Sequence, residues 1–334
     1  MRISFLGGGT DLPSYCQRDP GRVLSCTIDK CIFVIVKRRF DARVRVGYTR
    51  TELVDTVAEL EHDLVREALR VTGIESGVEI TTMGDIPSQG SGLGSSSTAT
   101  VGLLHGLWLY RGRLPSRRDL AEGACEVELH RLGRPAGRQD QYAAAFGGLR
   151  HWTFTGNEVH VTEPLSDTAT LRALDQSLLL FFTGATRSSS PVLAEQARRT
   201  DAHRGTLRAM AELADEGWDA LGRGDTTALG KLMHEGWMHK RTLAPGVSSS
   251  AIDAMYEAGR GAGAVGGKIC GAGGGGFLLL YCPPERHAAV RTALADYQEL
   301  RFSLDPQGTR VVANLPRAQW WLGSAGEVAL PGTE

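Results

Sequence analysis

The stretch Pro87-Ser-Gln-Gly-Ser-Gly-Leu-Gly-Ser-Ser-Ser97 decides how this chain is interpreted, because it sets a loop rich in glycine and serine between two regular elements. Before it, positions 78, 80 and 82 alternate with more polar neighbours, which predicts a strand. After it, apolar residues over 101–108 recur at helical spacing. The alternative, a flexible Ser/Gly linker without function, does not fit a segment flanked directly by a strand and a helix.

This loop has the features of a phosphate-binding site. Gly90, Gly92 and Gly94 let backbone N–H groups approach an anion with no Cβ in the way. The start of the following helix adds unpaired N–H donors and the positive end of the helix dipole. Its serine hydroxyls can bond phosphate oxygens or ligate Mg²⁺. The residues predicted to hold the phosphates are Gly90, Ser91, Gly92, Leu93, Gly94, Ser95, Ser96 and Ser97.

Two commoner phosphate motifs are excluded. A dinucleotide fingerprint G-x-G-x-x-G that begins at Gly90 needs a sixth-position glycine, where Ser95 stands. A P-loop needs Gly-Lys followed by Ser or Thr, but Gly267-Lys268 is followed by Ile269 and Gly230-Lys231 by Leu232. The loop therefore belongs to another class of phosphate site.

Composition describes an ordinary globular protein. The 334 residues are 42% hydrophobic and 22% charged, and 37 basic against 38 acidic residues leave a net charge of -1. That balance predicts no nucleic-acid partner. No apolar run approaches the ~18 residues of a membrane span and no signal-peptide pattern is present, so we expect no membrane segment and a cytoplasmic location. The six cysteines show no zinc spacing and are expected to be reduced and mostly buried.

Predicted strands and helices alternate along the chain, and a change of pattern between 160 and 170 indicates a domain boundary that separates 1–165 from 166–334. The length alone allows two domains or one large domain with a divided core. Predicted strands cover Arg2–Leu6, 23–37 (its end buried on both faces), Leu178–Phe182 and Phe277–Tyr281. Predicted helices cover 61–72, 117–131, 191–222 and 225–241.

Three glycine-rich motifs follow one another in order: 2–11, the loop at 87–97, and 268–276. In this order the chain resembles the GHMP kinases, and within them the kinases of D-glycero-α-D-manno-heptose 7-phosphate. The stretches that carry the resemblance are 2–15, 137–149, 182–190, 233–249 and 266–281. The resemblance implies two α+β domains with ATP and substrate in the cleft between them, the N-terminal domain carrying the phosphate loop.

The resemblance also implies the catalytic groups. Asp140 would orient the sugar hydroxyl and accept its proton, and Arg2 would offset charge in the transition state. Ser96 and Glu128 would ligate Mg²⁺, while Glu126 is interpreted as a solvated carboxylate. From the residues alone, Asp140 is equally suited to cap a helix over 142–146, since aspartate is a favoured N-cap.

Substrate contacts follow from two further turns. Asp11 resembles the family's ligand for a sugar hydroxyl, with stabilisation of its own turn as the alternative. Arg187 and the serines at a helix start, with Ser190 as N-cap and Pro191 in the first helical position, predict a second anion site apart from the nucleotide loop, the alternative being plain capping. The predicted substrate-binding residues are Thr10, Asp11, Gly184, Arg187, Ser188, Gly273 and Gly274. The cluster 271–276 is expected to abut the phosphate loop.

These features predict an ATP- and Mg²⁺-dependent sugar kinase. Its expected acceptor is the anomeric C1 hydroxyl of a sugar phosphate, heptose 7-phosphate, which would become the 1,7-bisphosphate. A GHMP kinase for another sugar, fucose- or galactose-like, and a non-catalytic sugar sensor are the alternatives. Trp237 would line the sugar pocket or pack in the core. The aromatic pair Trp320-Trp321 is a candidate oligomer interface, so a homodimer is possible.

Overall fold

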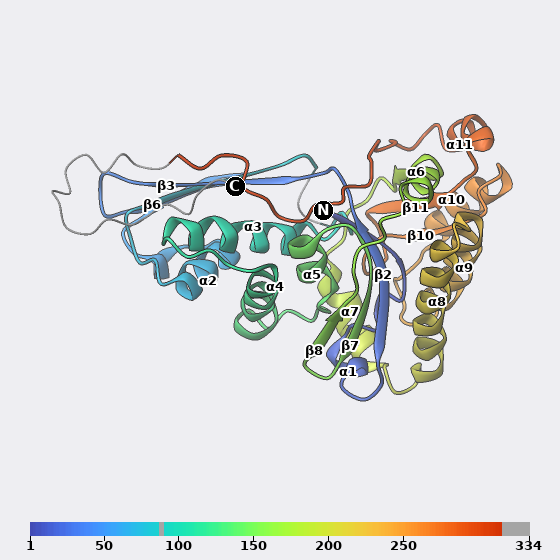
Figure 1. The fold of residues 1–334 in the computed structure, drawn as a ribbon, viewed down its shortest axis with the longest axis horizontal. Coiled ribbons are helices and arrows are strands. Elements are labelled where there is room, and N and C mark those ends of the chain that lie inside the picture. Colours follow the sequence, from blue (N-terminus) through green and yellow to red (C-terminus); the bar gives the residue numbers. More distant parts are fainter. Residues whose placement is uncertain (87–89, 316–334) are drawn as a thin grey trace, which may run out of the picture.

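The computed structural model describes residues 1–86 and 90–315, in which three β-sheets are covered by helices (Figure 1). The first sheet has the order β1-β2-β7-β8, the second β3-β6-β4-β5 and the third β10-β11-β9. The strands are β1 (Arg2–Leu6), β2 (Gly21–Thr27), β3 (Ile32–Arg38), β4 (Val44–Gly47), β5 (Thr51–Val54), β6 (Val78–Gly84), β7 (Leu149–Thr155), β8 (Glu158–Val161), β9 (Leu178–Phe182), β10 (Gly266–Ile269) and β11 (Phe277–Tyr281).

Helices alternate with these strands along most of the chain. The α-helices are α1 (Pro13–Cys16), α2 (Asp63–Thr72), α3 (Ser95–Tyr110), α4 (Arg117–Cys125), α5 (Gln139–Phe146), α6 (Thr168–Gln176), α7 (Ser189–Arg198), α8 (Arg204–Gly222), α9 (Thr226–Lys240), α10 (Ser250–Gly261) and α11 (His287–Ala293). A π-helical turn, Glu126–Arg131, continues α4. The mixed α+β class that the family resemblance implies is confirmed.

The two halves of the sequence share one hydrophobic cluster. Figure 1 shows β3 and β6 above α2, α3 and α4 on one side of the molecule, and α8, α9 and α10 on the other. Ile3 and Leu24, from β1 and β2, are buried in the same cluster as Leu213 of α8 and Leu279 of β11. Folding of the first two strands therefore depends on helices that follow more than 180 residues later in the chain.

Helix α3 lies close against β3 because two of its residues are glycine. A Cβ on Gly102 would lie 3.0 Å from Val34 Cγ2, and one on Gly106 would lie 3.0 Å from Val36 Cγ2. On the other face of β3, Phe33 and Ile35 are 43% and 50% exposed. The expectation that this run is buried on both faces is therefore wrong, because β3 is the edge strand of a mixed sheet that is covered by helices on one side only.

Three predicted boundaries also shift. The tract 191–222 is two helices, α7 and α8, separated at 199–203. Helix α5 begins at Gln139, so Asp140 lies within its first turn and is not its N-cap. Helix α7 begins at Ser189, so Ser188 takes the N-cap position expected for Ser190, and Pro191 stands third in the helix. A proline is still tolerated there, because the first turn has no intrahelical partners for its N–H groups.

Residues 299–309 cross from the third sheet back to the N-terminal half (Figure 1). The N–H of Leu300 donates to the Leu180 carbonyl, that of Asp305 to the Thr27 carbonyl at 2.9 Å, and that of Thr309 to the Ala144 carbonyl at 2.8 Å. These bonds tie β9, β2 and α5 together. We call residues 299–309 the crossing segment.

Gly147 tests how much the crossing segment matters for stability. Its φ is +73°, and an added Cβ would lie 1.9 Å from Gly308 N. We expect Gly147→Ala to lower the free energy of unfolding by at least about 2 kcal/mol, because a left-handed conformation and a backbone clash combine. Chemical denaturation measures this. The control Gly156→Ala also has positive φ, +57°, but meets nothing within 4 Å; equal losses in both variants would contradict the interpretation.

Candidate active site

The predicted phosphate loop leads directly into α3. Gly90, Gly92 and Gly94 have φ of +71°, +75° and +73°, a region that glycine adopts without strain. Gly94 is the N-cap of α3 and has no side chain to cap it. The first N–H groups of the helix are thus left for another acceptor, which an anion supplies well. The start of the quoted stretch, 87–89, lies outside the described residues.

The third glycine cluster lies against this loop, as the sequence predicted. A Cβ on Gly92 would lie 2.4 Å from the Cys270 carbonyl oxygen, and one on Gly276 would lie 2.5 Å from the Ser91 carbonyl oxygen. On its other side the cluster meets residues of the 243–248 turn, where a Cβ on Gly273 would lie 2.6 Å from the Val247 carbonyl oxygen. Close backbone approach accounts for glycine at these positions, and a contact of Gly273 or Gly274 with substrate stays a prediction.

Arg2 and Asp140 form a two-bond ion pair beside the N-terminus of α3. Arg2 Nε donates to Asp140 Oδ1 at 2.7 Å and Nη2 donates to Oδ2 at 2.8 Å. Nη1 donates to the Gly92 carbonyl at 2.6 Å. A Cβ on Gly94 would lie 3.3 Å from Arg2 Cγ and 3.4 Å from Asp140 Oδ2. The Arg2 side chain is 4% exposed and that of Asp140 is 25% exposed, so the carboxylate keeps access to solvent or substrate.

Glu128 is a buried carboxylate with one free oxygen. Its Oε2 accepts from Ser97 Oγ at 2.9 Å and from Gln141 Nε2 at 3.1 Å, whereas Oε1 has no partner among the described residues. Burial raises the pKa of Glu128. A carboxylate oxygen left unpaired in the interior fits a cation, because such a group is otherwise costly to bury.

Ser96 faces another partner. Arg134 Nη1 donates to Ser96 Oγ at 2.7 Å, and the same guanidinium pairs with Asp63 at 2.9 Å. The structure therefore brings Ser97, rather than Ser96, to Glu128. Sequence reasoning missed Arg134, because an arginine between Gly133 and Pro135 shows no pattern that links it to the loop.

Within the described ranges 1–86 and 90–315, no group of three His, Cys, Asp or Glu side chains is arranged to hold a metal ion.

The first motif is a tightly bonded turn. Thr10 Oγ1 donates to the Gly7 and Arg22 carbonyls, and it is fully buried. Asp11 Oδ1 accepts from Gly9 N at 3.0 Å and from Gln139 Nε2 at 2.9 Å. The turn-stabilising role considered for Asp11 is thus present, and a role for Thr10 or Asp11 in binding sugar stays a prediction.

Arg187 does not stand apart from the phosphate loop. A Cβ on Gly90 would lie 2.7 Å from Arg187 N, and one on Gly246 would lie 3.0 Å from Arg187 Nη1. The predicted second anion site therefore adjoins the phosphate loop, because β9 pairs with β11 and so carries the segment after it to the third glycine cluster and the loop. Binding of an anion by Arg187 stays a prediction. Ser188 is exposed, and Gly184 has φ of +79° with nothing within 4 Å of an added Cβ.

Two buried lysines close the site from the C-terminal half. Lys240 Nζ donates to the Gly8 carbonyl at 2.9 Å, and Lys268 Nζ donates to the Ser4 carbonyl at 2.7 Å. Burial lowers the pKa of Lys240 to about 8 and that of Lys268 to about 7 from the ordinary 10.5, and the charge of Lys240 adds to the effect on Lys268. The sequence held a signal for both, because they are two of only five lysines and both lie in motif stretches.

Trp237 is fully buried in a hydrophobic cluster with Tyr256 and Leu280, so it packs in the core. The pair Trp320-Trp321 lies outside the described residues.

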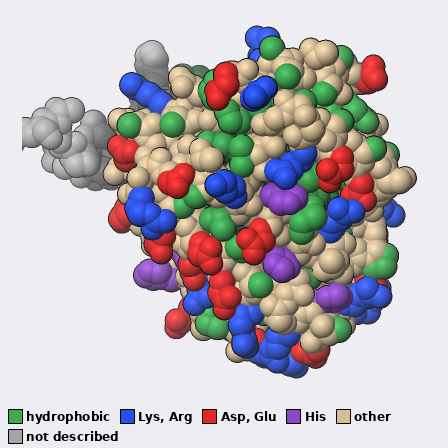
Figure 2. Space-filling view, turned by 90° about the vertical axis from the view of Figure 1, so that its right-hand side faces the viewer, with side chains coloured by type: hydrophobic (Ala, Val, Ile, Leu, Met, Phe, Trp, Pro, Cys, Tyr) green, Lys and Arg blue, Asp and Glu red, His purple; other side chains and the backbone are tan. Residues whose placement is uncertain are grey.

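No helix of the described chain is both long enough and apolar enough to cross a bilayer. On the face formed by α8 to α11, basic and acidic side chains are interspersed (Figure 2), in keeping with the near-zero net charge.

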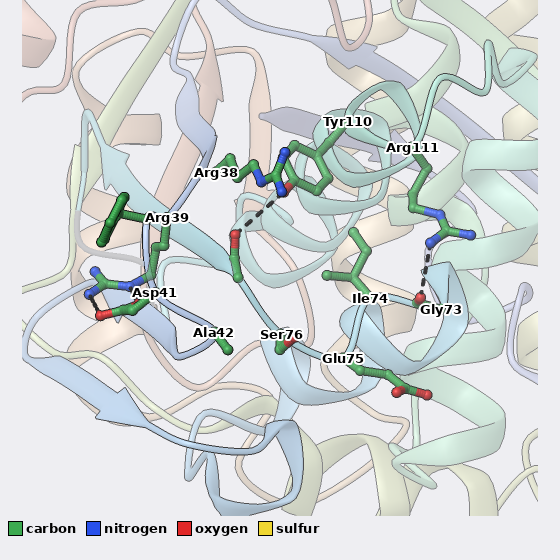
Figure 3. A pocket seen from close by; sticks show the side chains of 12 residues that line it. Arg38, Arg39, Asp41, Ala42, Gly73, Ile74, Glu75, Ser76, Tyr110 and Arg111 are labelled. Carbon is green, nitrogen blue, oxygen red and sulfur yellow. Dashed lines mark hydrogen bonds and ion pairs between the residues drawn. The ribbon is translucent and has the colours of Figure 1, made fainter.

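A surface pocket of about 560 Å³ opens at the outer end of the N-terminal half, where β3, α2 and α3 end (Figure 3). Figure 3 shows Arg38 and Tyr110 on one side of it and Arg111 beside Gly73. None of the predicted site residues lines this pocket. The candidate active site is therefore defined by the motif contacts described above and not by this hollow.

The sequence matches two known domain profiles. Residues 54–148 match the GHMP kinases N terminal domain, and residues 203–332 match the GHMP kinases C terminal domain. Mevalonate kinase of Methanothermobacter thermautotrophicus is 31% identical over 248 residues, which cover 74% of this chain and 78% of the relative. The chain belongs to the GHMP kinase family. The resemblance deduced from the three motifs is confirmed, and with it the assignment to a kinase family whose members use ATP.

Other GHMP kinases match over nearly the full length. D-glycero-alpha-D-manno-heptose 7-phosphate kinase of Campylobacter jejuni is 28% identical over 333 residues, covering 93% of this chain and 96% of the relative. The crystal structure of a D-glycero-D-manno-heptose 1-phosphate kinase from Bacteriodes thetaiotaomicron superposes with a TM-score of 0.77 at 24% identity, covering 94% of this chain and 98% of that one. The superposition on this crystal structure confirms the two-domain GHMP fold.

The buried Lys268 predicts an unusual pH dependence of stability. Between about pH 7 and 10.5 the unfolded chain holds a proton on this lysine that the native protein has lost, so stability should rise with pH over this window. Lys268→Met removes that contribution. As the pH rises, we expect the difference in free energy of unfolding between the wild type and the variant to shift in favour of the wild type, by up to about 1.4 kcal/mol per pH unit.

Urea denaturation at several pH values between 7 and 10 measures this difference. Lys231→Met, at an exposed position on α9, is the matched control and should follow the wild-type slope. Parallel curves for the wild type and Lys268→Met would show that this lysine keeps its proton in the native protein.

Proposed function

We propose that this GHMP kinase transfers the γ-phosphoryl group of ATP to the anomeric C1 hydroxyl of a sugar phosphate, with D-glycero-α-D-manno-heptose 7-phosphate as the acceptor and the 1,7-bisphosphate as product. The observation that carries the proposal is the Arg2–Asp140 pair, which lies against Gly94 at the uncapped N-terminus of α3. The Asp140 carboxylate, the Arg2 guanidinium and the free N–H groups at the start of α3 thus lie side by side.

This arrangement suits phosphoryl transfer, which needs positioning and neutralisation of charge more than covalent chemistry. The N–H groups of Ser95, Ser96 and Ser97 would hold phosphate oxygens. Asp140 would accept the proton of the acceptor hydroxyl as its oxygen bonds to phosphorus. Arg2 orients Asp140 through two bonds and would offset the negative charge of the transferring group.

The residues also fit a magnesium ion. Glu128 would hold it through the oxygen that lacks a protein partner, and Ser96 is the further ligand that the family resemblance proposes. Such an ion neutralises charge on the transferring phosphoryl group. Mg²⁺ is usually bound by one or two protein oxygens together with phosphate and water, which agrees with the small number of acidic side chains here.

The choice of acceptor rests on the full-length similarity to the Campylobacter jejuni heptose 7-phosphate kinase. The structurally similar protein from Bacteriodes thetaiotaomicron is named for heptose 1-phosphate, so both phosphates belong in the same assay. A plant bifunctional fucokinase is 26% identical over 90% of this chain, which supports L-fucose as the second candidate acceptor. ADP release with each sugar, and NMR of the product, decide the acceptor and the phosphorylated position.

Asp140→Asn tests the catalytic assignment. We expect kcat to fall by about 100-fold or more, because the amide cannot accept a proton, while KM for ATP changes little. Asp41→Asn is the matched control, since Asp41 is held in the same two-bond manner by Arg39 but lies on the loop after β3. Near-normal turnover of the Asp140 variant would remove this residue from the mechanism.

Arg187→Ala tests the acceptor phosphate. We expect KM for heptose 7-phosphate to rise roughly 10-fold or more, because a guanidinium–phosphate contact is lost, with KM for an unphosphorylated sugar unchanged. Arg198→Ala, in the last turn of the helix that follows Arg187 and paired with Glu195, is the control. Because Arg187 also borders Gly90, a rise in KM for ATP alone would instead assign it to the nucleotide.

A further inference from the structure

Four polar side chains from different elements converge on the glycine turn of the first motif, and the proposed mechanism uses none of them. A Cβ placed on Gly8 would lie 3.3 Å from Ser4 Oγ, 3.6 Å from Gln139 Nε2 and 3.6 Å from Lys240 Nζ. A Cβ on the next residue, Gly9, would lie 3.6 Å from Gln196 Oε1. These side chains come from β1, α5, α9 and α7, so both halves of the sequence contribute.

Their hydrogen bonds are incomplete. Ser4 Oγ, Gln139 Oε1 and Gln196 Oε1 are buried and have no partner within residues 1–86 and 90–315. The orientation of each amide is fixed by its nitrogen, since Gln139 Nε2 donates to Asp11 at 2.9 Å and Gln196 Nε2 donates to the Ala272 carbonyl at 3.3 Å. Most buried polar groups in proteins are paired, so three unpaired oxygens around one turn call for a ligand.

Lys240 is also only partly satisfied. Its ammonium group has three donors, and in the part of the chain that the structure describes it makes one hydrogen bond, to Gly8, and no salt bridge. It is buried, and Asp11 and Asp140 act on it only from beyond ion-pair distance. A buried ammonium group normally acquires a partner, because its desolvation is otherwise uncompensated.

The free groups identify the chemistry of the missing partner. Two amide carbonyl oxygens can only accept hydrogen bonds, and the serine hydroxyl and lysine supply donors beside them. A phosphate dianion offers acceptors alone and would face the two carbonyl oxygens unfavourably. Sugar hydroxyls both donate and accept, so a row of hydroxyl groups satisfies every member of the set.

We propose that Lys240, Gln196, Gln139 and Ser4 bind the hydroxyl groups of the acceptor sugar and exclude its phosphate group from this place. This inference rests on the proposed function only in taking the acceptor to be a sugar. It assigns the recognition of the sugar's hydroxyl pattern to the space around Gly8, whereas Arg187, whose guanidinium lies against Gly246 and Gly274, is left for the phosphate.

Calorimetric titration tests the inference without turnover. The ligands are heptose 7-phosphate, heptose 1-phosphate, L-fucose and D-galactose, and the variants are Lys240→Met and Gln196→Leu. For the sugar that the wild type binds, we expect Kd to rise roughly 10- to 100-fold in each variant, because a buried donor or acceptor loses its partner. The affinity for ADP should stay unchanged. Lys231→Met, on the exposed side of α9, should bind sugar as the wild type does.

Gly8→Ala gives a second test that spares the side chains. Gly8 has an ordinary φ, and its nearest contact with an added Cβ is 3.3 Å, so the variant should fold. The methyl group would occupy the space among the four side chains and should weaken sugar binding by a similar factor. Thermal denaturation of every variant separates loss of binding from loss of folding.

Unchanged sugar affinity in folded Lys240→Met, Gln196→Leu and Gly8→Ala would overturn the inference, as would a wild type that binds none of the four sugars. Loss of affinity for inorganic phosphate, rather than for the sugar, would overturn the assignment to hydroxyl groups. A wild type that binds a sugar but releases no ADP would contradict the proposed function, and the binding results of the variants would still decide the subsite.

Discussion

The close approach of glycine backbones is the constraint on which the rest of this structure depends. With a Cβ on Gly92, the phosphate loop and the strand end at Cys270 would clash at 2.4 Å, and a Cβ on Gly276 would clash with Ser91 in the same way. The loop comes from the N-terminal half and its neighbours from the C-terminal half. Because these backbones touch, Arg2 can bond both Gly92 and Asp140, and the N-terminus of α3 is held beside the Arg2–Asp140 pair.

The second constraint is the balance of buried charge. Arg2, Lys240 and Lys268 bring three cationic groups to one region, against the carboxylates of Asp11 and Asp140. Burial destabilises the charged form of a lysine. The pKa values of Lys240 and Lys268 are therefore lowered, which favours the neutral form when no ligand is present. In the proposed function, the acceptor's hydroxyl groups would supply the missing hydrogen-bond partners, and the phosphates of ATP would bring negative charge to the neighbouring loop. Stability and binding are therefore coupled at this site through the same side chains.

Much of this could be predicted from the sequence, because backbone requirements leave clear marks. The loop at 90–97, the strand before it and the helix after it follow from glycine placement and apolar periodicity. The side chains around Gly8 could not be predicted, because Lys240 and Gln196 follow it by some 190 to 230 residues and no local pattern encodes which side chain faces which turn. The prediction that the end of the run 23–37 is buried on both faces was wrong for the same reason, since an apolar run does not say whether one or two layers will cover it.

The partners of Ser96 and Ser97 show how helix geometry divides the metal and phosphate roles. Successive residues of an α-helix point about 100° apart, so the two hydroxyls face different neighbours here. Ser97 is bonded to Glu128, and Ser96 is bonded to Arg134, which Asp63 holds in place. For Ser96 to share a cation with Glu128, the guanidinium of Arg134 must give up its bond to the serine oxygen. Arg134 would then have donors free for a phosphate oxygen beside the same helix end, so the loss of one contact prepares the other.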